Sequence, residues 1–190
     1  MDIYYLFAYI TGGLIILLSL LTFIFPKRKL TLVFKTSLDL MAFLNCLFIF
    51  FATKDPDFIA GIVTNIIATI RDMVFYFRNK AKALNHIAWP IGFAALNAGS
   101  LIFTYRSPIS ILPVVGSVIS TLSLYNNDQR VIKIGGLIAA SFYLTYYAIK
   151  LTDSDILTIF SLLDSAASIV SSFVGLIILF VRKRNEKVSE

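Results

Sequence analysis

Residues 156–181, ILTIFSLLDSAASIVSSFVGLIILFV, form an apolar run that a single acidic residue, Asp164, interrupts. A helix needs about 20 mainly apolar residues to cross the hydrocarbon core of a bilayer, so this run is long enough. The whole chain of 190 residues is also strongly apolar, because 58% of its residues are hydrophobic, 15% are charged and the mean hydropathy is +0.83. Soluble domains usually carry about 25% charged residues. The sequence therefore predicts an all-α integral membrane protein.

Charged residues and prolines divide the chain into further apolar segments. Working outward from residues 156–181, we expect seven transmembrane helices, at residues 4–25, 31–52, 57–78, 84–104, 108–126, 131–151 and 156–181. Seven spans of about 20 residues use roughly 140 residues, which leaves no room for a soluble catalytic domain. The high apolar content, the nine glycines and the single cysteine exclude a disordered chain, a collagen and a disulfide scaffold.

The basic residues gather at alternate ends of these segments and so predict an orientation. Thirteen of the 17 lie at one set of ends: Lys27, Arg28, Lys29, Lys35, Arg78, Lys80, Lys82, Arg130, Lys133, Arg182, Lys183, Arg184 and Lys187. The other set has Lys54, Arg106 and Lys150, together with the acidic residues Asp2, Asp55, Asp57, Asp153 and Asp155. The positive-inside rule predicts an N-terminus outside and a C-terminus in the cytoplasm. The net charge of +6 is then an orientation signal, and we expect no nucleic-acid partner.

An internal repeat links the third and seventh segments. The stretch NIIATIRD at residues 65–72 corresponds to DSAASIVS at residues 164–171, at an offset of 99. The polar residues of each stretch follow the spacing i, i+4, i+7, which places them on one helix face. Three helices reverse the direction of the chain, so a second parallel copy requires one additional span. We therefore expect a three-helix bundle at 1–82, a linker helix at 83–106 and a second three-helix bundle at 107–190.

Two of these stretches carry a resemblance to a known family. Residues 64–71, TNIIATIR, and residues 107–121, SPISILPVVGSVIST, resemble YgjV-type bacterial inner-membrane proteins, and the resemblance covers most of the chain. It implies a multi-pass protein of the bacterial inner (plasma) membrane. The 3+1+3 plan also looks like the SWEET, PQ-loop and PnuC group of small-solute transporters.

The SWEET resemblance implies a substrate position. In SWEETs, paired Asn residues in the third and seventh spans line the substrate pocket; Asn65 matches this position, whereas Asp164 departs from Asn. The Pro-Gln dipeptide typical of PQ-loop proteins is absent, since Pro113 precedes Val114. The acidic residue argues against a neutral sugar as the substrate.

Polar residues inside a bilayer are costly and tend to face a bundle interior or an aqueous cavity. At 1.5 Å per residue, Asp164 would lie roughly 13 Å below the outer boundary, and Asn65 would lie at a similar depth. We expect the two residues on opposite walls of one substrate cavity. The alternatives are a structural interhelical hydrogen bond and a proton-carrying role for Asp164. Further candidates for contact with the substrate are Thr69, Ser168, Asn45 and Tyr143.

A second candidate feature is an ion pair in the cytoplasmic half of the membrane. Arg71 requires neutralisation by Asp39 or by Asp72, and the sequence leaves open which acid pairs with it. The pair is either purely structural or an inner gate that breaks and reforms.

Three residues are candidate hinges, namely Gly12, Gly13 and Pro113, because Gly and Pro weaken helices locally. Static packing is the alternative, since both residues are common in membrane helices.

Together, these features predict a transporter, either a facilitator or proton-coupled. It would move a small polar solute such as a sugar, vitamin or nucleoside by alternating access between the two repeats. The alternative is a non-transporting interaction or assembly protein with the same fold. We expect no enzyme, cofactor or metal, because the lone His86 has no ligand cluster around it. The expected partners are the lipid bilayer and the solute, and a homo-oligomer is left open.

Overall fold

The structure is a computed structural model that describes residues 3–55, 57–78, 80–105, 107–151 and 156–188. Every regular element in these ranges is helical. Four residues used above to assign the ends of the spans, Asp2, Arg106, Asp153 and Asp155, lie outside the described residues. The side chains of Asp57, Arg184 and Lys187 are also outside the description.

The helices follow the apolar segments of the sequence closely. They are α1 (Ile3–Thr22), α2 (Arg28–Thr53), α3 (Asp57–Phe77), α4 (Ala88–Gly99), α5 (Leu101–Thr104), α6 (Ile111–Tyr125), α7 (Gln129–Lys150) and α8 (Ile156–Val188), with 3₁₀ turns at Lys82–Asn85 and Pro108–Ser110. Within the described residues, α1, α2, α6 with its preceding turn, α7 and α8 are long and apolar enough to cross a membrane. At 1.5 Å per residue, the 21 residues of α3 extend over about 32 Å.

The expected fourth span, residues 84–104, is not one continuous helix. The segment begins as a 3₁₀ turn, becomes α4 only at Ala88, and breaks at Ser100 before α5. Proline disfavours helical geometry in the residue before it and is accommodated in a first turn, which agrees with the position of Pro90 two residues after the start of α4. Gly99 lowers helix propensity at the other end. The twelve residues of α4 extend only about 18 Å.

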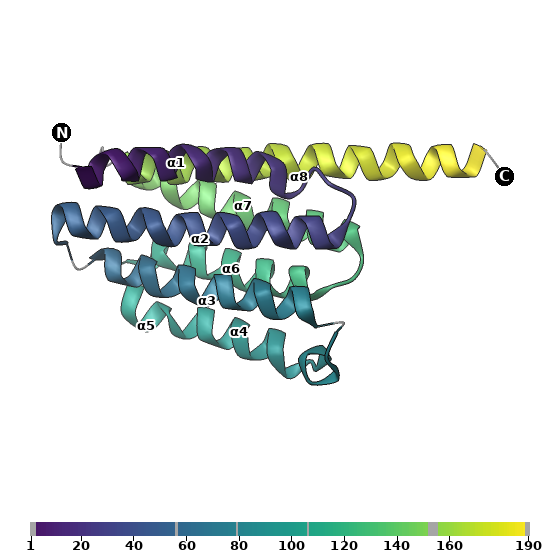
Figure 1. Cartoon of the computed structure of the whole chain (residues 1–190), viewed down its shortest axis with the longest axis horizontal. Helices are drawn as coiled ribbons and strands as arrows, with labels where there is room; N and C mark the ends of the chain where they lie inside the picture. Colours follow the sequence, from purple (N-terminus) through teal and green to yellow (C-terminus); the bar gives the residue numbers. More distant parts are fainter. Residues whose placement is uncertain (1–2, 56, 79, 106, 152–155, 189–190) are drawn as a thin grey trace.

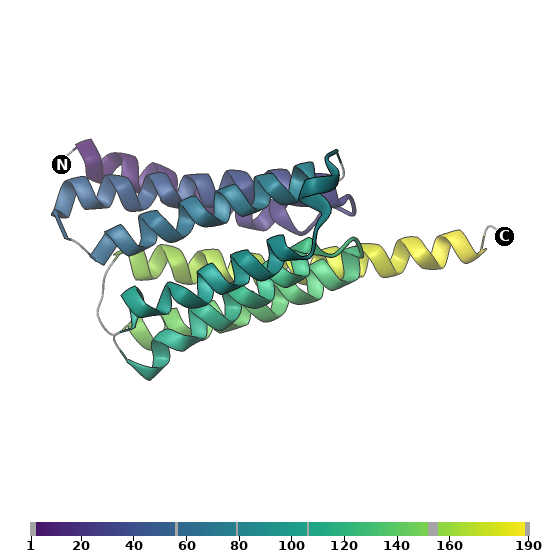
Figure 2. The ribbon, with the colours of Figure 1, turned by 90° about the horizontal axis from the view of Figure 1, so that it is seen from below.

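The helices form two layers, with the middle helix of each expected bundle packed on both of its neighbours. In one layer α2 packs between α1 and α3, and in the other α7 packs between α6 and α8, with α4 against α6. The layers meet along α1 and α8 and, less extensively, along α3 and α6. Figures 1 and 2 show that α1, α3, α6 and α8 run in one direction, whereas α2, α4 and α7 run in the other. The up-and-down order of the first three helices thus recurs in the last three.

One end of the molecule carries most of the basic residues. The α1–α2, α3–α4 and α6–α7 connections lie at the same end as the C-terminus, beyond which α8 projects (Figure 1). We call this the basic end, because Lys27, Lys29, Lys80, Lys82 and Lys183 are exposed there. The N-terminus and the α2–α3 connection lie at the opposite end. This separation is the one that the charge pattern predicts.

The buried apolar core lies toward the basic end. It consists of Phe23, Leu32, Phe75, Phe93, Leu124 and Ile132. All but Phe93 lie within a few residues of the end of their helix, and together they come from both layers. In Figure 2 the α1 ribbon approaches that of α8 toward this end, in agreement with the extensive contact between these two helices. The layers are therefore held together mainly at the basic end.

Candidate functional site

Four charged side chains form a buried network between α2 and α3. The Arg71 Nε atom donates to Asp72 Oδ1 at 2.6 Å, and its second terminal nitrogen, NH2, donates to Asp39 Oδ2 at 3.3 Å. Lys35 donates to Asp39 Oδ1 from one helical turn away. The side chains of Asp39, Arg71 and Asp72 are 5%, 3% and 0% exposed. Two cations therefore balance two acids, and Arg71 pairs with both of the acids that the sequence left as alternatives.

This network also reaches the second layer. The Arg71 NH1 atom donates to Thr121 Oγ1 on α6 at 3.1 Å. Thr121 also accepts a hydrogen bond from Asn97 Nδ2 on α4 at 3.0 Å, and it donates to the Ser117 carbonyl oxygen at 2.8 Å. The Thr121 hydroxyl thus joins a charge of the first layer to α4 and α6. One acceptor in this network is unused, because Asp72 Oδ2 is buried and has no hydrogen-bond partner among the described residues.

Tyr143 lies on the other side of the same network. Its side chain is half-buried and interacts with that of Ser117. The ring packs on α6, where a Cβ atom added at Gly116 would lie 3.2 Å from Tyr143 Cε2. The Tyr143 phenol is also within electrostatic range of Arg71 and Asp39. This residue, predicted to contact the substrate, is therefore close to the charged network.

The two residues expected to form a substrate pair each have a partner within the protein. Asp164 on α8 accepts a hydrogen bond from Ser19 Oγ on α1. Asn65 Nδ2 on α3 donates to Cys46 Sγ on α2 at 3.7 Å. The Asp164 contact crosses between the layers, whereas the Asn65 contact stays within one layer. Their placement on opposite walls of one cavity stays a prediction.

The remaining residues predicted to bind substrate have different surroundings. Asn45 is 3% exposed and donates to the Ala8 carbonyl oxygen at 2.7 Å and to Thr11 Oγ1 at 2.9 Å, so its amide nitrogen joins α2 to α1. Thr69 donates to the Asn65 carbonyl oxygen at 2.8 Å, one turn back on its own helix. Ser168 is half-buried on α8.

The candidate hinge residues lie within helices. Helix α1 continues through Gly12 and Gly13 without a break. A Cβ atom at Gly12 would lie 2.9 Å from the Phe160 ring, so the absence of a side chain lets α1 approach α8, whereas nothing lies within 4 Å of such an atom at Gly13. Pro113 lies in the first turn of α6, where many backbone N–H groups have no intrahelical partner. No hinge motion follows from these positions, and hinging stays a prediction.

A set of hydrogen bonds joins the layers at the end of α1 nearest the basic end. The Phe23 N–H donates to Ser171 Oγ on α8 at 2.8 Å. Lys133 on α7 donates to the carbonyl oxygens of Phe23 and Phe25, the latter at 2.9 Å. Lysine near a helix C-terminus satisfies carbonyls that have no intrahelical partner. Lys133 was expected among the loop cations, but it is fully buried and acts as a cap for α1.

Two arginines make equivalent contacts with the end of α6. Arg28 Nε donates to the Asn126 carbonyl oxygen at 3.1 Å, and its NH2 atom donates to the carbonyl oxygens of Leu124 and Phe75 at 3.3 and 3.2 Å. Arg78 donates to the Tyr125 carbonyl oxygen, and its guanidinium lies 4.2 Å from the centre of that ring. First-layer cations therefore bind the C-terminal carbonyls of a second-layer helix.

Sequence reasoning missed several members of these networks. Lys35 was assigned to a loop-facing end, although its spacing of four residues from Asp39 is the one at which helical ion pairs form. Its repeat equivalent, Lys133, has Leu137 in place of an acid. Ser19 and Thr121 were not predicted to join these networks, because hydroxyl residues are common in membrane helices.

Comparison with protein-family models gives one match, to a family described as bacterial inner membrane proteins of the YgjV type, over residues 6–179. The chain belongs to the YgjV family. The match extends over all the membrane helices, and together with the long apolar helices it supports a multi-pass inner-membrane protein. No curated protein and no solved structure matches this YgjV-family chain. The described residues contain no group of three or more His, Cys, Asp or Glu side chains that would hold a metal ion.

Proposed function

We propose that this YgjV-family protein transports a small polar solute across the bacterial inner membrane by alternating access. The observation that carries the proposal is the buried network of Lys35, Asp39, Arg71 and Asp72. Charged side chains inside a membrane are costly and typically mark substrate or ion pathways. Here they lie where α3 of one layer meets α6 of the other, through Arg71 and Thr121. A role in transport accounts for this cost better than packing alone does.

The position of the unused acceptor supports a binding role. Asp72 Oδ2 is buried and has no partner in the part of the chain that the structure describes, although Asp72 Oδ1 is bound by Arg71 at 2.6 Å. A proton or a donor group of the solute would occupy this oxygen. Tyr143, on the facing helix α7, would supply a hydroxyl and a ring for stacking. The solute would also be bound nearer the N-terminal end of the molecule, by Asn65, Thr69, Asp164 and Ser168.

The contacts between the layers favour one conformational state. The layers are joined in the half toward the basic end by the Phe23–Ser171 hydrogen bond. The contacts of Arg28, Arg78 and Lys133 with helix-end carbonyls lie in the same half. We interpret this state as closed at the basic end. By the positive-inside rule this is the cytoplasmic end, with the N-terminus outside. In the proposed cycle the two three-helix units rock as SWEET-like repeats, with α4 as linker.

The test is an unbiased comparison of metabolites in cells that contain or lack the protein. Four versions are expressed at matched membrane levels: the native chain, Asn65→Ala, Asp164→Ala and the control Ser37→Ala. Ser37 is on α2 and makes only a local bond, to the Val33 carbonyl oxygen at 3.0 Å. We expect a solute whose level depends on the native chain and on the control but not on the other two variants. The same metabolite change with all four versions would refute the proposed site.

A second function is favoured by one observation. The amide nitrogen of Asn45 is fully used by α1, and Asp164 is bound by Ser19, as expected if these residues only hold helices together. The protein would then be a non-transporting assembly partner with the same fold. In that case no metabolite would depend on the native chain, whereas Asn45→Ala would still lower the thermal stability of the purified protein.

A further inference from the structure

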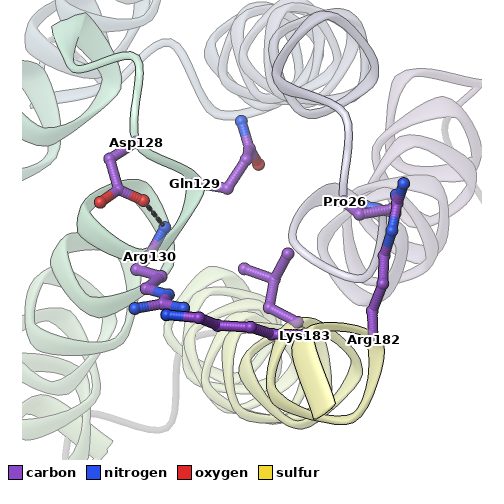
Figure 3. A pocket seen from close by; sticks show the side chains of 7 residues that line it. Pro26, Asp128, Gln129, Arg130, Arg182 and Lys183 are labelled. Carbon is purple, nitrogen blue, oxygen red and sulfur yellow. Dashed lines mark hydrogen bonds between the residues drawn. The ribbon is translucent and has the colours of Figure 1, made fainter. Parts of the chain in front are cut away.

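A pocket of about 350 Å³ opens between the two layers at the basic end. Its walls come from three places: Pro26 in the α1–α2 connection, the first turn of α7, and the projecting part of α8. It is lined by Pro26, Asp128, Gln129, Arg130, Leu179, Arg182 and Lys183 (Figure 3). None of these residues belongs to the charged network described above. The pocket is therefore a separate feature of the molecule.

The lining is electropositive. Arg130, Arg182 and Lys183 contribute three positive charges, and Asp128 contributes one negative charge. The Asp128 carboxylate is already engaged, since its Oδ1 atom accepts from the Arg130 N–H at 2.8 Å and caps α7. Figure 3 shows the Arg130 and Lys183 side chains converging from α7 and α8. The Arg130 guanidinium lies 5.8 Å from the centre of the Phe180 ring on α8, which confirms that it reaches the other helix. Converging cations favour an anion between them.

The pocket also has an unused hydrogen-bonding group. Both the amide nitrogen and the amide oxygen of Gln129 are buried and, within the described residues, have no hydrogen-bond partner. A buried amide without partners costs free energy unless a ligand satisfies it. Figure 3 shows this amide across the pocket from the Arg130 and Lys183 nitrogens, so a headgroup that fills the pocket would place its phosphate at the cations and a hydroxyl or ester oxygen at Gln129. Gln129 thus points to a ligand independently of the charges.

The surface next to the pocket suggests a lipid as the source of this phosphate. On α8, Phe173, Ile177, Phe180 and Val181 are 48–63% exposed. They form an apolar surface along the same helix that supplies Arg182 and Lys183. A phospholipid would place its acyl chains along this surface and its headgroup in the pocket. Clusters of basic residues at the cytoplasmic ends of membrane helices attract anionic headgroups in this way.

We propose that this pocket binds the headgroup of an anionic phospholipid, with the phosphate at Arg130 of α7 and Lys183 of α8 and the rest of the headgroup toward Gln129. The inference does not depend on transport. The test uses the purified full chain in nanodiscs of phosphatidylcholine to which phosphatidylglycerol is added in steps, with bound lipid counted by native mass spectrometry. We expect saturable retention of phosphatidylglycerol over phosphatidylcholine. Equal retention of both lipids would overturn the proposal.

The decisive variants remove equal charge at two places on the same end. Arg130→Gln with Lys183→Gln removes two pocket cations, whereas Lys80→Gln with Lys82→Gln removes two exposed cations elsewhere. At the usual contribution of a hydrogen bond to a charged group, the pocket pair should lose at least about 100-fold in affinity for phosphatidylglycerol. The control pair should retain native affinity. Equal losses in the two pairs would mean diffuse attraction and would overturn the site.

Two further measurements complete the test. Gln129→Leu keeps all the charges and should weaken lipid retention while circular dichroism shows native helix content. Inorganic phosphate, added at millimolar concentration to detergent-solubilised protein, should not displace the lipid. If phosphate alone displaces it, the pocket is a site for a free anion, and the proposal of a lipid is wrong.

Discussion

The buried network gives the sharpest prediction of stability. Replacing Arg71 with Gln leaves Asp39 and Asp72 with only Lys35, so a network of two cations and two acids acquires one unbalanced negative charge. Because these groups are almost fully buried, water cannot screen that charge. Removing one partner of a buried ion pair typically costs about 3–5 kcal/mol. For a chain of this size, each kcal/mol shifts the melting temperature by about 2–4 °C, so we expect a loss of roughly 6–20 °C.

A compensating variant separates lost charge balance from lost packing. In Arg71→Gln with Asp72→Asn, the remaining Lys35 and Asp39 again balance, so at least half of the lost melting temperature should return. The assay is thermal unfolding of detergent-purified protein, followed by circular dichroism, with Lys82→Gln as the control. Lys82 is exposed, and such substitutions usually stay within about 0.5 kcal/mol. The reasoning fails if Arg71→Gln has the same melting temperature as the Lys82→Gln control. It also fails if the double variant has a lower melting temperature than Arg71→Gln alone.

Three further predictions concern packing, an interhelical clamp and orientation. Gly175→Ala should destabilise the protein by about 1–3 kcal/mol, because a Cβ atom there would overlap the Phe23 carbonyl oxygen. The control Gly13→Ala places its Cβ atom in open space and should not lower the melting temperature. Asn45→Ala should cost about 1–3 kcal/mol in the same melt, because it removes the two buried hydrogen bonds by which the Asn45 amide joins α2 to α1. In a cysteine-free background, an impermeant maleimide should label Lys54→Cys but not Lys80→Cys in intact cells; the reverse pattern would invert the proposed topology.

Most of the helices could be predicted from the sequence, because span length and apolar content are local properties. Six of the seven expected spans correspond to helices, and their ends fall within about three residues of the expected positions except at the C-terminus of α8, which continues seven residues further. The span expected at 108–126 begins with a 3₁₀ turn before α6. The exception is residues 84–104, where Pro90 and Gly99 change backbone geometry inside an apolar run. Hydropathy does not register such breaks, since it sums side chains and not backbone conformations. The gathering of basic residues at one end was also predictable, because the helices alternate in direction.

The candidate site was only partly predictable. Arg71 inside an apolar helix required acidic partners, and this requirement identified Asp39 and Asp72 in advance. Helical periodicity could not decide between them, because Arg71 and Asp72 project about 100° apart and the partner depends on where α2 lies. Thr121 on α6 completes the Arg71 contacts. It belongs to the stretch 107–121 that carries the family resemblance, but helical spacing does not show that its hydroxyl meets an arginine of another helix.

The sequence by itself determined the membrane class, the family, the approximate spans and the end at which the cations gather. These properties follow from composition and from the direction of each helix. Only the tertiary structure decided what each polar group meets: that Lys133 is a cap for α1 and no loop cation, that Asn45 clamps α1, and that Asp164 binds Ser19. The physical reason is that a buried polar group takes whichever partner the packing brings within about 3 Å. That choice depends on how neighbouring helices are arranged, which no single helix encodes.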